Sequence, residues 1–175
     1  MAGRLDPAER ARLDLLLGRV LEEIGLTYER VAVGVYLVTL EGEHKLRTTT
    51  WLVVQDTTLL VEAFFMRKPA ENEGATYRFL LGRNSRTYGV HFCVDRIGDV
   101  YLTGRLPLEA VTPEEIDRVL GCVRTYSDDN FDPAVALGFA GAIEREKAWR
   151  AKLAAAAGQR PHDADPGGPG ADPGG

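Results

Sequence analysis

The sequence predicts an α+β domain in which helices flank an antiparallel sheet. The hydrophobic period is helical near the N-terminus and changes to two from Tyr28, and short turns join the runs of period two. The expected order is helix, three strands, helix, two strands, helix, followed by a helical extension. Of the 175 residues 45% are hydrophobic and 27% are charged, which is typical of a globular domain with a substantial core.

The first helix is expected to begin at Asp6-Pro7. Asp6 is a typical N-cap, Pro7 occupies the first helical position, and Glu9 completes a capping box. Apolar side chains then recur at helical spacing from Leu13 onwards, and Gly25 is a typical C-terminal stop.

The next three runs, residues 33–40, 45–55 and 59–66, are expected to form an antiparallel meander because their turns are short. Both faces of these strands carry large apolar side chains. One face therefore covers the core, and the other is expected to meet a helix or a second chain. We predict a partner-binding apolar surface at Trp51, Val53 and Phe64. The alternative is that the C-terminal helix covers this face through Ile143 and Trp149.

The second half of the chain continues the mixed pattern. Residues 72–85 predict a helix, residues 88–94 and 99–106 predict a hairpin, and Thr112 caps a helix whose apolar stripe runs from Ile116 to Val123. Residues 128–132 are expected to be a loop, followed by a short helix and a longer one from about 139 to 157. We therefore expect one domain over residues 1–157, with its helical extension from about 132. Residues 158–175, with six Gly and four Pro, are expected to be a disordered tail.

Several classes of function are disfavoured by the composition. A net charge of −5 argues against nucleic-acid binding, and the longest uncharged apolar run, Val31 to Leu40, is far shorter than the ~20 residues of a membrane span. The isolated Cys93 and Cys122 suit a reducing cytoplasm. The histidines lack metal-ligand spacing, and phosphate loops and nucleophile motifs are absent from the sequence. We expect no metal, no cofactor and no enzymatic activity.

One group of polar residues suggests an anion site. Arg83, Arg86 and Arg105 could hold an acidic peptide or a phosphate if the second helix end and the hairpin come together, with Asn84 and Asp99 beside them. A salt-bridged surface is the other interpretation of the same residues.

Three stretches carry a resemblance to a known family: HKLRTTTWLVVQD (residues 44–56), YRFLLGRNSRTYGVHFCVDRIGDVYLTGRLPLEAVTPEEID (77–117) and GFAGAIEREKAWR (138–150). Together they resemble actinobacterial proteins with a YbjN domain, also described as bacterial sensory transduction regulators. The resemblance covers roughly Leu5 to Arg150. It implies a fold like that of the type III secretion chaperones, of order αβββαββα with a bent antiparallel sheet. Proteins of that fold often form homodimers and bind extended client segments on an apolar sheet surface.

The expected function is that of a non-enzymatic protein-binding module, a chaperone-like adaptor or regulator in the cytoplasm. Its partner is a protein, and a homodimer is expected. The alternative is a small-ligand sensor or cryptic enzyme that uses the Arg/Asp pocket.

Overall fold

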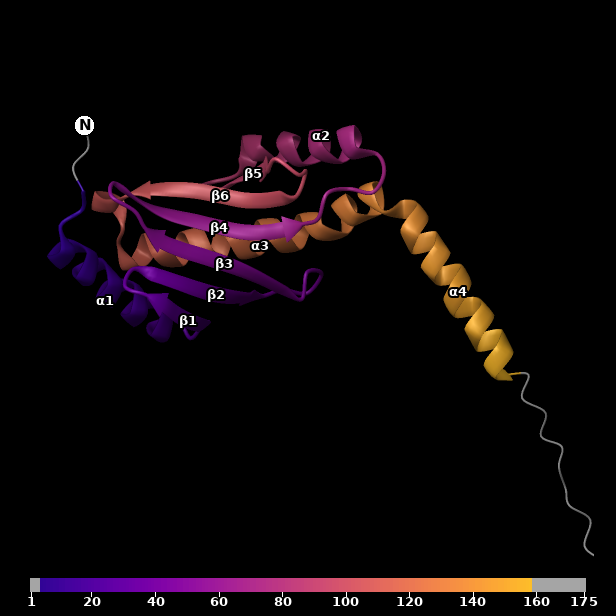
Figure 1. The fold of residues 1–175 in the computed structure, drawn as a ribbon, viewed down its shortest axis with the longest axis horizontal. Helices are drawn as coiled ribbons and strands as arrows, with labels where there is room; N and C mark the ends of the chain where they lie inside the picture. The colour runs from indigo at the N-terminus through magenta and orange to yellow at the C-terminus, as the bar shows by residue number, and fades with distance from the viewer. Residues whose placement is uncertain (1–3, 159–175) are drawn as a thin grey trace, which may run out of the picture. The chain divides into compact units, whose positions relative to one another are not determined.

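The computed structural model describes residues 4–158, which form two compact units: one ends at Ala140 and the other begins at Gly141. The helices are α1 (Pro7–Glu23), α2 (Glu73–Arg83), α3 (Pro113–Gly138) and α4 (Ala140–Gly158), with short 3-10 helices η1 (Asn84–Arg86) and η2 (Leu108–Ala110). The strands are β1 (Thr27–Ala32), β2 (Val35–Glu41), β3 (Arg47–Val54), β4 (Thr58–Met66), β5 (His91–Val94) and β6 (Val100–Pro107). They pair antiparallel in the order β1-β2-β3-β4-β6-β5 (Figure 1).

The helices of the first unit pack on one face of the sheet. In β2 the core-facing side chains are Tyr36, Val38 and Leu40, and every second residue of β3 and β4 continues this buried face. Helix α1 contacts β1 and β3, α2 contacts β5, and α3 contacts β2 and β4. Figure 1 shows α3 running behind the central strands. The first unit is therefore a two-layer structure in which one face of the sheet carries the hydrophobic core.

The α+β antiparallel class expected from the sequence is confirmed, and the structure adds an edge strand. The first strand was expected to begin at Val33, whereas the chain forms a separate β1 and then turns at Gly34, which has φ +73°. Glycine adopts this left-handed conformation without strain. Residues 27–32 of β1 are almost all exposed, so their side chains do not alternate between buried and exposed positions as those of the other strands do.

The prediction of a loop at residues 128–132 is wrong, because α3 continues through this segment and contains Pro133. Asp128 accepts hydrogen bonds from the β2–β3 turn, the Asn130 amide donates to the Tyr126 carbonyl at 2.9 Å, and Ala134 is buried in the core. Tertiary packing therefore holds a segment whose polar residues and proline suggest a break. The helical extension accordingly begins at Ala140, later than the expected position near 132.

The two predicted capping boxes have different outcomes. The Thr112 hydroxyl accepts a hydrogen bond from the Glu115 backbone N–H at 3.2 Å, as expected. The Asp6 side chain forms no capping hydrogen bond, and Glu9 instead pairs with Arg12 one turn later. Helix α1 nevertheless begins at Pro7, where the ring of proline already provides a helical φ.

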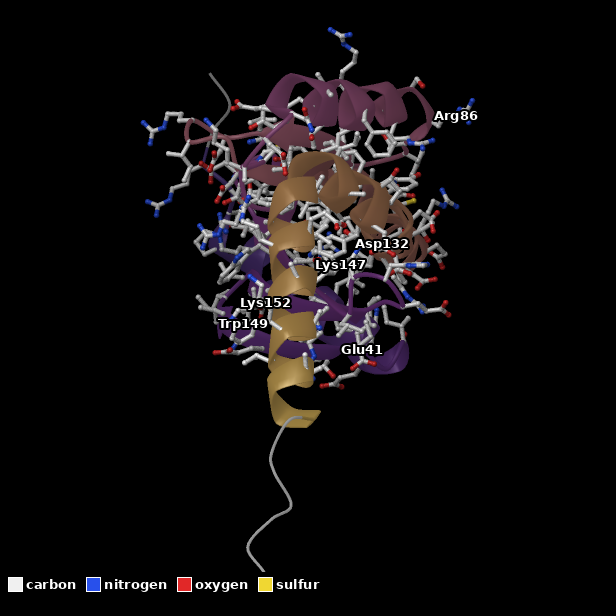
Figure 2. All side chains as sticks on the ribbon, turned by 90° about the vertical axis from the view of Figure 1, so that its right-hand side faces the viewer. Glu41, Arg86, Asp132, Lys147, Trp149 and Lys152 are labelled. Carbon is white, nitrogen blue, oxygen red and sulfur yellow. The ribbon has the colours of Figure 1, made fainter. Side chains whose placement is uncertain are left out.

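Helix α4 confirms the C-terminal helix that was expected from about 139 to 157. Ion pairs such as Lys147 with Glu144, at 3.0 Å, stabilise its polar surface. Trp149 is 60% exposed, and Figure 2 shows it projecting from the same side of the helix as Lys152. Of the tail expected over residues 158–175, Gly158 is the last residue of α4, and residues 159–175 lie outside the described part of the chain.

Candidate interaction surface

The face of the sheet opposite the core, which we call the open face, carries a group of apolar side chains with Glu62 among them. Its apolar members alternate with the core residues along four neighbouring strands. They are Val35 and Leu37 of β2, Trp51 and Val53 of β3, Leu60 and Phe64 of β4, and Tyr101 of β6. All seven keep part of their side-chain surface accessible.

The strand register places these residues side by side. Val53 lies opposite both Val35 and Leu60, and Trp51 lies opposite Leu37. Directly opposed side chains on neighbouring strands contact each other, so the rows form one patch rather than scattered apolar residues. No helix of residues 4–140 lies over this patch, because α1, α2 and α3 pack on the opposite face.

The structure brings the three predicted partner-binding residues to this one face. Trp51 is 37% exposed, and Val53 and Phe64 are half-buried by their neighbours. The Phe64 ring meets the Tyr101 ring edge-on, with centroids 5.6 Å apart. This T-shaped contact fixes the orientation of Phe64 while leaving the rest of the patch accessible.

Two charged side chains belong to the same face, Glu62 within the apolar rows and Arg105 at their edge. Glu62 lies opposite Trp51 in the register, and Arg105 lies opposite Leu60. A carboxylate therefore lies inside the patch, between Leu60 and Phe64 on β4, and a guanidinium lies at its border.

The predicted anion-binding residues are distributed over several places. Arg83 and Arg86, at the end of α2 and in η1, contribute to a small pocket of about 200 Å³ together with part of α3. The Arg83 guanidinium lies 4.7 Å from the centre of the Phe79 ring. Figure 2 shows Arg86 projecting from the edge of the molecule near α2.

The other three members of that group have separate structural environments. The Asn84 side chain hydrogen-bonds both backbone groups of Phe92 and thereby holds β5. Asp99 is buried, and its carboxylate accepts a hydrogen bond from the Arg67 guanidinium at 3.3 Å. Arg105 belongs to the open face of β6. The structure thus brings Arg83 and Arg86 together and leaves Asn84, Asp99 and Arg105 elsewhere.

A structural contact that the sequence analysis missed joins α3 to the β2–β3 turn. The Asp128 carboxylate accepts backbone hydrogen bonds from Glu43, His44 and Lys45 at 3.1, 2.8 and 2.8 Å. Desolvation opposes ionisation, but these hydrogen bonds outweigh it and lower the pKa of Asp128. The three acidic or amide residues at 128, 130 and 132 were the only feature of the sequence that could have indicated this contact. Their partners, more than eighty residues away, could not be identified from spacing.

The cysteines are unpaired, and both are half-buried. Burial in β5 raises the pKa of the Cys93 thiol, and the nearby carboxylates of Glu62 and Asp95 act in the same direction. Within residues 4–158 there is no group of three or more His, Cys, Asp or Glu side chains placed to hold a metal ion. None of the described helices combines the length and apolar character needed to cross a membrane.

The fold belongs to the type III secretion chaperone-like class of α+β domains. A chain in the crystal structure of the ExsC–ExsE complex superimposes with a TM-score of 0.52 at 16% sequence identity, over 70% of this chain and 93% of that one. At this identity the likeness defines the fold and not the activity.

The chain belongs to the YbjN family, which is described as "Putative bacterial sensory transduction regulator" and whose model matches residues 16–135. Uncharacterized proteins of Mycobacterium tuberculosis and Mycobacterium bovis are 48% identical to it over 114 residues, and one of Mycobacterium leprae is 44% identical. The match covers 65% of this chain and 62% of the length of those relatives. The resemblance to the YbjN family is confirmed.

Proposed function

We propose that this protein is a non-enzymatic protein-binding module, a chaperone-like adaptor or sensory transduction regulator that holds a protein partner on the open face. The observation that carries the proposal is the apolar patch on four adjacent strands, which no other element of residues 4–140 covers. A patch of this kind on a folded domain marks an interaction site.

The composition of the open face suits a binding site better than a random apolar surface. Trp51 stands near its centre with Val53 and Leu37 beside it, and tryptophan is among the residues that most often dominate binding energy. Glu62 beside Trp51 and Arg105 beside Leu60 would orient the partner by charge. A partner that lays an apolar helix or strand across β2, β3 and β4 would bury this centre.

Several features support regulation rather than catalysis. The family description is that of a regulator. The two histidines within residues 4–158 have neighbours that serve local structure: His44 pairs with Asp132 at 2.8 Å, and His91 contacts the Thr87 hydroxyl at 2.6 Å. The proposal places the module in the cytoplasm, where its unpaired thiols would stay reduced.

The test compares the two tryptophans of the chain. Tagged wild type, Trp51→Ala and Trp149→Ala are used to capture partners from the lysate of the source organism, with captured proteins quantified by mass spectrometry. Trp51 belongs to the open face, whereas Trp149 is an exposed tryptophan of α4 and serves as the matched control. Circular dichroism and thermal melting establish that each variant is folded.

We expect one near-stoichiometric partner that is lost with Trp51→Ala and retained with Trp149→Ala. With that partner purified, Trp51→Ala should raise the dissociation constant by about 30-fold. This factor corresponds to a loss of roughly 2 kcal/mol of binding free energy, as expected for a central tryptophan. A partner that binds the Trp51→Ala protein with unchanged affinity would exclude the open face as the site.

The same face would also serve a homodimer, which the fold class suggests as a second occupant. In a two-fold symmetric interface the Val35, Val53 and Leu60 row would pack against its own copy. Sedimentation equilibrium of wild type and Trp51→Ala measures this directly. A dimer that dissociates in Trp51→Ala supports self-association through the open face, and a monomeric wild type rules the homodimer out.

A further inference from the structure

The first unit contains a cavity of about 640 Å³ at one end of the sheet, separate from the open-face rows around Trp51. It lies between the β2–β3 turn, the C-terminal end of β4 and the second half of α3. Its apolar wall consists of Leu46, Phe64, Phe65, Met66, Phe131, Val135 and Phe139. The volume falls within the roughly 300–1,000 Å³ of small-molecule sites, and the mainly apolar wall is typical of them.

The charged residues that line this cavity are all basic. His44, Lys45, Arg47 and Arg67 line it, and its lining contains no aspartate or glutamate, although the chain as a whole carries a net charge of −5. Two of these bases already have acidic partners: His44 pairs with Asp132, and Arg67 with Asp99.

Lys45 and Arg47 differ from the other two bases. Within residues 4–158 neither has a carboxylate within 4.0 Å. The cavity therefore presents positive charge that the protein itself leaves uncompensated.

The Lys45 ammonium is half-buried against neutral groups. It donates to the Phe64 carbonyl at 2.9 Å and makes longer contacts with the Thr48 hydroxyl at 3.3 Å and the Arg47 carbonyl at 3.4 Å. It also lies 6.0 Å from the ring centres of both Phe64 and Phe131. Burial lowers the pKa of Lys45 to about 8, which reflects the cost of a charge that no anion offsets.

We infer that this cavity binds a small amphiphilic carboxylate, with the apolar chain against the phenylalanines of β4 and α3 and the carboxylate beside Lys45 and Arg47. An anion would replace the two long contacts of Lys45 with a charge-assisted hydrogen bond. It would also supply the countercharge that the lining lacks. The inference goes beyond protein binding on the open face. Trp51 is outside the cavity lining, and only Phe64 belongs to both sites.

The experiment measures binding of decanoate below its aggregation threshold to the full chain, by titration calorimetry and by NMR. Decylammonium and decanol carry the same chain with positive or no charge. Wild type, Lys45→Met and the matched control Lys68→Met are compared, because Lys68 is a lysine outside the lining that pairs with Glu73.

We expect decanoate to bind wild type and Lys68→Met with affinities within about twofold, and Lys45→Met at least about tenfold more weakly. Decylammonium should bind more weakly than decanoate. In wild type, decanoate should shift the amide signals of Leu46, Phe131 and Val135, and Trp51→Ala should bind it normally. This last result keeps the test independent of the open-face proposal.

Three results would overturn the inference. They are equal affinity for decanoate and decylammonium, an unchanged decanoate affinity in Lys45→Met, and shifts confined to the open face. Flotation of the protein with phosphatidylglycerol vesicles tests whether the ligand of the cavity is a free amphiphile or a lipid in a membrane. Vesicle binding that depends on Lys45, without decanoate binding, would contradict a site for a free carboxylate.

Discussion

Replacing the buried Asp14 tests the contact that joins α1 to the β1–β2 hairpin. The Asp14 carboxylate, on a residue that is 5% exposed, accepts hydrogen bonds from the Arg30 guanidinium at 2.8 Å and from the Gly34 backbone N–H at 2.8 Å. The Tyr36 hydroxyl donates to the Asp14 backbone carbonyl at 2.8 Å. One residue thus connects a helix, the edge strand and the turn that begins β2.

The expected magnitude for Asp14→Ala follows from the groups it leaves behind. The Gly34 N–H is buried and would lose its acceptor, which costs roughly 1–3 kcal/mol. The Arg30 side chain is 49% exposed and can be rehydrated, so its lost ion pair adds about 0–1 kcal/mol. A total of about 1–4 kcal/mol corresponds to a fall of roughly 2–16 °C in melting temperature for a chain of this size.

The assay is urea unfolding followed by circular dichroism, with Asp129→Ala as the control for an exposed aspartate of α3. Asp14→Asn retains an acceptor for Gly34 and should lose about half as much stability as Asp14→Ala. A loss below about 1 kcal/mol in Asp14→Ala, with an unchanged denaturant slope, would refute this account of the hairpin.

The same contact has a pH dependence of defined sign. Desolvation raises the pKa of Asp14, but the hydrogen bonds from Arg30 and Gly34 outweigh it, and the net pKa is lowered. A carboxyl with a lower pKa in the folded state contributes stability above its unfolded pKa of about 3.9, and this contribution is lost as the pH falls through the folded value. The difference between wild type and Asp14→Asn should therefore shrink below about pH 4.

Three further predictions concern other elements. Gly34→Ala should destabilise the protein by roughly 1–3 kcal/mol, because φ is +73° and a Cβ would lie 3.0 Å from Val54 Cβ. The control Gly74→Ala in α2 has open space for the added Cβ and should be neutral or slightly stabilising. Equal melting temperatures of these two variants would contradict this prediction. Asp128→Asn should accelerate hydrogen exchange at Glu43, His44 and Lys45, while Asp132→Asn, which removes only the partner of the His44 ring, should chiefly lower the pKa of His44. The folded pKa of Lys45 is about 8, so between this value and about pH 10.4 the unfolded chain binds more protons than the folded chain. The urea midpoint of wild type should therefore rise with pH across this window relative to that of Lys45→Met. Midpoints of the two proteins that change in parallel with pH would contradict this prediction.

The regular elements with strong local patterns could be predicted, and the exceptions have identifiable causes. The helix of residues 7–23 and the hairpin of β5 and β6 follow from hydrophobic period and turn residues. Strand β1 was missed because its side chains are almost all exposed at the sheet edge. The break expected near Asp132-Pro133 is absent because α3 is held by contacts on both sides of the proline.

The candidate sites divide in the same way. Trp51 and Val53 could be placed on one face from the alternation of strand residues, since side chains two apart point the same way. That Phe64 of the next strand shares this face follows from the β3–β4 register. The proposed anion group failed to assemble, because its members come from elements whose packing no local pattern specifies.

The sequence by itself determined the class of the fold and the apolar character of both sheet faces, because composition, period and turn chemistry are local properties. The family followed from the resemblance of three stretches of the sequence. Only the tertiary structure decided which face the helices cover. It also decided that Asp128 holds the β2–β3 turn, and that the turn, the end of β4 and the second half of α3 line one basic, open pocket. Those arrangements depend on contacts between residues far apart in the chain, whose formation is governed by packing rather than by spacing.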